Sequence, residues 1–163
     1  MPITAEGWEP GDLNPQDQWP ADFESAASTN SARLPWHRCY ATPSGARGSG
    51  IPALQPGTTG QAVHEAVAEV IREGGYSMGA PTSEKDEEWI GMRHGTGHGI
   101  GLDVNEPILL ATGGGEILER EVFTVEPGLY SAIHGGVRVE DMVAVTATGH
   151  ENFNQLHSEL DWR

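Results

Sequence analysis

Four residues of this chain have side chains that bind metals or transfer protons, and they lie in three short segments. They are His94, His98, Glu126 and Glu140, within residues 93–104, 123–128 and 137–141. Imidazole nitrogens and carboxylate oxygens are common ligands of divalent ions such as zinc. One imidazole and two carboxylates that meet over a cleft would hold one such ion. The pattern therefore predicts a divalent-metal site.

The two histidines are separated by Gly95, Thr96 and Gly97. Two glycines at this spacing would destabilise a helix, so the pair differs from the helical histidine pair of zinc proteases. On a glycine-lined strand or bend, one imidazole can bind a metal while the other faces a substrate. Ordinary loop histidines are the simpler interpretation of the pair alone. The two glutamates favour a functional site.

Both glutamates are predicted on or beside strands. Glu126 precedes Pro127 and Gly128, so it lies where a strand ends and the chain turns. Glu140 falls in a predicted strand, on the same face as Arg138. A buried carboxylate there is costly unless it is paired or metal-bound. Two alternatives remain for Glu140: a metal ligand, or an ion pair with Arg138 at the sheet surface.

The middle of the chain predicts one amphipathic helix. A turn at 56–57 and a capping-box pattern of Thr58 with Gln61 precede it, and glycines at 74–75 end it. Its apolar residues recur at helical spacing, with glutamates on the opposite face: Glu65, Glu69 and Glu73. His64 is interpreted as a packed or solvated helix residue rather than a ligand, because no neighbour has metal-ligand spacing.

The two sides of residue 50 differ in composition. Residues 1–50 contain six prolines and show neither a helical nor an alternating apolar period, so an irregular or divergent N-terminal segment is predicted. Residues 51–163 are predicted to be the folded part, with strands at 92–95, 99–105, 121–126 and 137–146.

The charge balance excludes several partners. The chain has 24 acidic and nine basic residues, and Lys85 is its only lysine. Such a chain repels phosphate, so nucleic acid and membrane surfaces are not expected partners. An acidic, lysine-poor chain suits a salt-rich, halophilic cytoplasm. Cys39 is the only cysteine and no long apolar run occurs, so we expect a cytoplasmic protein without disulfides.

Three segments are similar, in order and spacing, to the C-terminal half of the pita-bread metallopeptidases, which include methionine aminopeptidases, Xaa-Pro aminopeptidases and prolidases. They are His94-Gly-Thr-Gly-His-Gly-Ile-Gly-Leu-Asp-Val, Phe123-Thr-Val-Glu-Pro-Gly-Leu-Tyr and Gly135-Gly-Val-Arg-Val-Glu-Asp. The Arg-Val-Glu-Asp form resembles the Xaa-Pro branch. The resemblance covers about residues 51–151 and implies an α+β, partial pita-bread (creatinase/aminopeptidase-like) fold, with an antiparallel curved sheet and covering helices.

The same resemblance implies roles for the site residues. The metal ligands would be His98, Glu126 and Glu140. Family members hold two divalent ions, often manganese, cobalt or zinc, and the pKa of the water that they share falls towards about 7, so that it attacks the scissile carbonyl. His94 would contact the substrate or the oxyanion, and Glu126 would carry the proton. Asn105 and Arg138 would lie on the substrate side.

The chain departs from the family pattern at two places. The two aspartates that complete the family's metal site are not recognisable, and the upstream candidates are interpreted as surface acids: Asp12, Asp17 and Asp22. Asn105 stands where Xaa-Pro enzymes usually have a second active-site histidine, and an amide cannot carry a proton. We therefore expect one ion, or two if the missing aspartates are supplied.

Three hypotheses about function follow. The first is a metal-dependent, Xaa-Pro aminopeptidase-like enzyme that cleaves N-terminal peptide bonds. The alternatives are a catalytically inactive pita-bread module that binds a peptide or a partner protein, and a truncated fragment without a function of its own. The aspartate pair discriminates between them. Unpaired strands predict a homodimer or a complementing chain.

Overall fold

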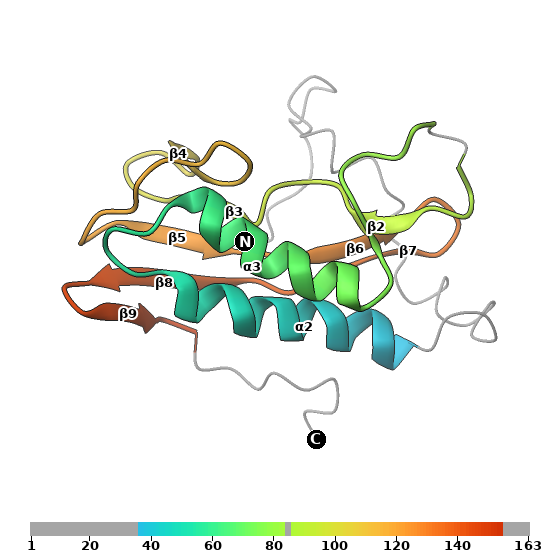
Figure 1. Ribbon diagram of the computed structural model, residues 1–163, viewed down its shortest axis with the longest axis horizontal. Helices are drawn as coiled ribbons and strands as arrows, with labels where there is room; N and C mark the ends of the chain where they lie inside the picture. The colour runs from blue at the N-terminus through green and yellow to red at the C-terminus, as the bar shows by residue number, and fades with distance from the viewer. Residues whose placement is uncertain (1–35, 84–85, 155–163) are drawn as a thin grey trace, which may run out of the picture.

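The computed structural model describes residues 36–83 and 86–154. In this part of the chain two helices, α2 (Trp36–Ala53) and α3 (Gly60–Glu73), precede nine short strands. The strands are β1 (Ser77–Met78), β2 (Ile90–Met92), β3 (Gly97–Gly99), β4 (Glu106–Leu110), β5 (Val122–Val125), β6 (Gly128–Ser131), β7 (Gly135–Arg138), β8 (Asp141–Thr146) and β9 (Gly149–Asn152). Figure 1 shows the two helices side by side along the strands.

The strands form two sheets. One has the order β4-β3-β5-β8-β9 and is antiparallel throughout; the other has the order β1-β2-β6-β7 and is antiparallel except between β1 and β2. In the described residues the chain passes from one sheet to the other three times, between β2 and β3, β5 and β6, and β7 and β8. The prediction of an α+β fold with antiparallel strands and covering helices is confirmed.

Helix α3 confirms the predicted amphipathic helix. Its buried face consists mainly of apolar residues: Val63, Val67, Ala68 and Ile71. The predicted cap is off by one residue, because the hydroxyl of Thr59 accepts from the Ala62 N–H at 3.1 Å. The Thr58 hydroxyl instead donates to the Gln55 carbonyl at 2.7 Å.

Helix α2 contradicts the irregular structure predicted for residues 36–50. Its buried positions recur every three or four residues but carry mostly small side chains: Cys39, Pro43, Ala46 and Gly50. These small residues let α2 approach α3 closely, since a Cβ at Gly50 would lie 2.7 Å from Val67 Cγ2. The helix therefore forms through packing against α3 despite two internal prolines. Residues 1–35 lie outside the described part, and the domain boundary at residue 50 stays a prediction.

Two apolar clusters lie between the helices and the sheets. The first joins Leu54 and Val63 to buried residues on and around the five-stranded sheet: Leu110, Ile117, Phe123, Val125, Val143 and Val145. The second joins helix residues to the four-stranded sheet: Ala46, Val67, Ile71, Met92 and Leu129. Burial of each large apolar side chain contributes about 1.5–3 kcal/mol, so these clusters hold the helices against the sheets that carry the candidate site.

The strand predictions are only partly correct. The strand predicted at 121–126 corresponds to β5. The strands predicted at 92–95 and 99–105 are mostly wrong, because β2 ends at Met92 and β3 ends at Gly99, so each prediction shares one residue with a strand. The strand predicted at 137–146 is divided at 139–140 into β7 and β8, although buried and exposed residues alternate across the break as predicted. Strands β1, β4, β6 and β9 were not predicted. No helix in the described ranges is long and apolar enough to cross a membrane.

Candidate metal centre at the junction of the two sheets

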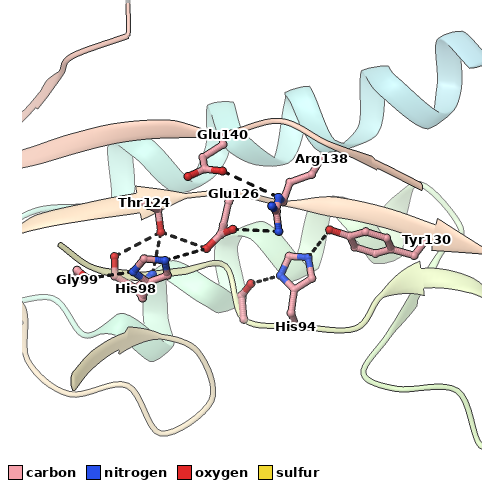
Figure 2. A network of polar contacts seen from close by, with 9 residues as sticks. His94, His98, Gly99, Thr124, Glu126, Tyr130, Arg138 and Glu140 are labelled. Atoms are coloured by element: carbon pink, nitrogen blue, oxygen red, sulfur yellow. Dashed lines mark hydrogen bonds and ion pairs between the residues drawn. The ribbon is translucent and has the colours of Figure 1, made fainter. Parts of the chain in front are cut away.

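The three connecting segments between the two sheets carry most of the predicted site residues. His94 lies on the connection from β2 to β3. Glu126 lies between β5 and β6, and Glu140 lies between β7 and β8. His98 is the middle residue of β3, which pairs with β5. Figure 2 shows that the side chains of these residues gather around Thr124 and Arg138.

The segment between the two histidines lies against the end of β5. A Cβ at Gly97 would collide with the backbone carbonyl of Thr124, so glycine is required for this approach. The Glu126 N–H donates to the Thr96 carbonyl at 2.7 Å and fixes the same segment to the residue that follows β5. The prediction that the histidines lie on a glycine-lined strand or bend is confirmed.

His98 and Glu126 face each other. The Nδ1 of His98 lies 2.9 Å from the Gly99 carbonyl oxygen, which can only accept, so this nitrogen carries a proton and donates. In the neutral ring Nε2 then has a free lone pair, and it lies 3.6 Å from Glu126 Oε1. Two electron-rich atoms are therefore directed at one another, an arrangement that a cation or a proton between them would stabilise.

Thr124 holds both members of this pair. Its hydroxyl oxygen accepts from the His98 backbone N–H at 3.0 Å and donates to Glu126 Oε1 at 3.2 Å (Figure 2). Thr124 is 2% exposed, so neither hydrogen bond is readily replaced by water. The orientation of the Glu126 carboxylate is thus set from within β5.

Arg138 links the two glutamates. Its guanidinium lies 3.4 Å from Glu126 Oε2 and 3.9 Å from Glu140 Oε2. The side chain of Glu140 is 45% exposed and is directed to Arg138, as in the second of the two alternatives, an ion pair at the sheet surface. In residues 36–83 and 86–154 no three His, Cys, Asp or Glu side chains are placed to hold a metal ion together. His98 and Glu126 converge, and the ligand role of Glu140 stays a prediction.

His94 uses both ring nitrogens within the protein. Nδ1 donates to the Gly95 carbonyl at 2.6 Å, so Nε2 accepts from the Tyr130 hydroxyl at 2.9 Å. Burial lowers the pKa of His94 below its ordinary value of 6.5 and raises the pKa of Tyr130 above 10.0. Near neutral pH the neutral imidazole therefore has no N–H free for a substrate oxygen while Tyr130 occupies Nε2. The predicted contact of His94 with substrate stays a prediction.

The remaining predicted residues are Asn105 and three aspartates. Asn105 is exposed in the segment 101–105 that leads into β4. Its substrate role, like that of Arg138, stays a prediction. The candidate aspartates lie outside the described residues: Asp12, Asp17 and Asp22.

Three residues of the site were not singled out from the sequence: Thr96, Thr124 and Tyr130. Thr124 stands two residues before Glu126 in a strand, so the alternation of side chains could have identified it as a neighbour of the carboxylate. Tyr130 and Thr96 make contacts between elements that are distant in the sequence, and no local pattern predicts them.

Comparisons with known proteins agree on one family. The model of metallopeptidase family M24 matches residues 29–147. The uncharacterized peptidase YqhT of Bacillus subtilis is 34% identical over 71% of this chain, and the Xaa-Pro dipeptidase of Pyrococcus furiosus is 32% identical over 68%. The chain spans only 30% and 28% of their lengths. The structure of the Xaa-Pro dipeptidase from Bacillus anthracis superposes with a TM-score of 0.65 and 34% identity, covering 77% of this chain and 32% of that one.

Proposed function

Because this chain belongs to metallopeptidase family M24 and has a partial pita-bread fold, we propose that His98, Glu126 and Glu140 hold one divalent ion in a peptidase centre of the Xaa-Pro type. The proposed reaction is hydrolysis of the peptide bond that follows the N-terminal residue of a short peptide. Since the chain spans about 30% of the length of the curated relatives, the activity of the whole protein is part of this proposal.

One observation carries the proposal: the lone pair of His98 Nε2 faces Glu126 Oε1 at 3.6 Å. The proton of the imidazole is used by the Gly99 carbonyl at 2.9 Å, which is the usual way in which a metal-bound histidine is held in its ligand tautomer. A nitrogen and two carboxylates are also a suitable donor set for an ion with three protein ligands. As placed, His98 and Glu126 offer two ligands to a divalent ion, and Glu140 would complete the set only after its carboxylate leaves Arg138.

The ion would polarise a peptide carbonyl and lower the pKa of a water molecule to about 7. The chain's own residues supply the remaining roles. Thr124 and Arg138 hold the two oxygens of Glu126 and so fix the carboxylate that receives the proton of the attacking water. Tyr130 donates to His94 and can turn its hydroxyl to a carbonyl oxygen that enters beside the ring.

Titration of the metal-free chain with manganese, cobalt and zinc tests the proposal. We expect one ion per chain and a loss of affinity of about 100-fold or more in His98→Ala, because the only nitrogen ligand is removed. The matched control is His150→Ala, which removes an exposed histidine on β9. Equal affinity in the wild type and His98→Ala would refute the site. Hydrolysis of an Xaa-Pro dipeptide by the metal-loaded chain, abolished in His98→Ala, tests the peptidase activity.

The contacts of Arg138 favour a second candidate function, an inactive module that binds peptides. The guanidinium lies within 3.9 Å of both glutamates and can balance their charge without an ion. Binding of an Xaa-Pro dipeptide by a chain that takes up no ion and shows no turnover would support this alternative. A second copy or a complementing chain that supplied further carboxylates would raise the ion count to two.

A further inference from the structure

One contact joins the helix layer to the segment between the two site histidines. His64 lies in α3 and is 9% exposed, and its Nδ1 lies 2.9 Å from the hydroxyl oxygen of Thr96. Thr96 is fully buried. It stands midway between His94 and His98.

Thr96 is held from three directions. Its N–H donates to the Leu110 carbonyl at 2.7 Å, and its own carbonyl accepts from the Glu126 N–H at 2.7 Å. These two contacts come from β4 and from the residue that follows β5. The third contact, to His64, is made by the side chain and comes from the helix layer. A displacement of Thr96 would therefore move the histidine segment and the backbone of Glu126 together.

The side chains of His64 and Thr96 suit each other chemically. A threonine hydroxyl can both donate and accept, so it pairs with either tautomer of a neutral imidazole. Burial lowers the pKa of His64, which keeps the ring neutral near pH 7. Without the imidazole, the hydroxyl of a fully buried threonine would have to find another partner, and the backbone would shift to provide one.

We propose that His64 is a positioning residue of the candidate metal centre, which acts through the Thr96 hydroxyl to fix His98 and Glu126 in register. This inference rests on the proposed function for its effect on the ion. Its effect on the geometry of the segment is independent of that function. His64 does not itself bind the ion or the substrate.

Paired substitutions of the full chain separate the hydrogen bond from the volume of the side chain. His64→Leu removes the partner of Thr96 at similar size, whereas His64→Asn keeps an amide group near the position of Nδ1. Thr96→Val and Thr96→Ser form the corresponding pair on the other side of the contact. Ile71→Val is the control for general destabilisation. It removes one methylene group from the buried face of the same helix, in the apolar cluster that packs against the four-stranded sheet.

Two readouts are measured on each variant. The first is amide hydrogen exchange at Glu126 in the metal-free chain, relative to slowly exchanging amides of β8. The second is the affinity for zinc. In His64→Leu and Thr96→Val we expect the Glu126 amide to exchange about tenfold faster. We also expect zinc to bind about tenfold more weakly, because removal of a residue that orients a metal ligand usually lowers metal affinity by at least this factor. His64→Asn, Thr96→Ser and Ile71→Val should stay close to the wild type on both readouts.

The double variant His64→Leu/Thr96→Val should differ little from either single variant, because both remove the same contact. If His64→Leu and His64→Asn have the same Glu126 exchange rate, or if the two single changes are additive, the proposal is wrong. If the wild type binds no zinc, the proposed function fails, and the exchange measurements alone decide the role of His64.

Discussion

Replacement of Thr124 by valine tests whether a single hydroxyl holds the two facing residues of the site. Valine has nearly the same shape and a higher preference for strands, so strand propensity alone predicts that Thr124→Val is neutral or stabilising. The structure predicts the opposite, because the hydroxyl accepts from the His98 N–H at 3.0 Å and donates to Glu126 Oε1 at 3.2 Å.

The expected magnitude follows from these two contacts. A buried backbone N–H left without a partner costs about 1–3 kcal/mol, and a hydrogen bond to a charged group contributes about 1.5–3 kcal/mol. Arg138 still holds the other oxygen of Glu126, at 3.4 Å, which limits the second term. We therefore expect Thr124→Val to lower the free energy of unfolding by about 2–4 kcal/mol, a large share of the roughly 5–15 kcal/mol of an ordinary domain.

Urea unfolding followed by circular dichroism measures this change, and Thr124→Ser is its control. Serine keeps the hydroxyl and removes one methyl group, which costs about 1 kcal/mol. The amide of His98 should also exchange faster in Thr124→Val than in Thr124→Ser. If the valine variant is as stable as the serine variant, the hydroxyl does not hold the site and the reasoning is refuted.

Three further predictions concern the whole fold. Arg47→Met removes the positive charge that lies 3.2 Å from Oδ1 of the buried Asp141, whereas Asn152 still donates to Oδ2 at 2.8 Å. We expect this change to lower the free energy of unfolding, measured in urea, by about 3 kcal/mol. Arg72→Met, in an exposed pair, should change it by less than about 1 kcal/mol. Burial lowers the pKa of His64 and of His94, so the unfolded chain takes up protons first as the pH falls. The contribution of these two histidines to stability should be complete above pH 6.5 and decline below it. The midpoint of urea unfolding, measured between about pH 8 and about pH 5, checks this expectation, and a midpoint that does not change with pH would contradict it. With a formal net charge of −15, the chain should show a higher folded fraction in multimolar salt than in dilute buffer, by circular dichroism.

Sequence periodicity predicted the elements that have one buried and one exposed face. Helix α3 and the alternation through β8 follow directly from the spacing of apolar residues, most of them valines. Helix α2 has the same helical spacing of buried positions, but its residues are small, and hydrophobicity does not mark them. Its signal lies in residues such as Ala46 and Gly50, which pack because they leave room for α3.

The candidate site could be predicted in its residue types but not in its contacts. The motifs identified the four acid and imidazole side chains, and the glycines between the histidines indicated a close backbone approach, which Gly97 makes to β5. The partners of these residues come from other elements: Tyr130 for His94, Thr124 for His98, and His64 for Thr96. The helical period correctly put His64 in α3, and only the fold brings α3 to the histidine segment.

The charges of the cluster favour one ion over two. Glu126 and Glu140 contribute two negative charges and Arg138 contributes one positive charge. Because a histidine must be neutral to bind a metal, the set of residues that would receive the ion carries a net charge of about −1. One divalent ion would change this to about +1, a small excess that an anionic ligand can balance. A second ion would raise it to about +3 in a partly buried site, and two more carboxylates would be needed to return it to +1. An ion count of two would therefore indicate that carboxylates beyond Glu126 and Glu140 enter the site, from this chain or from another.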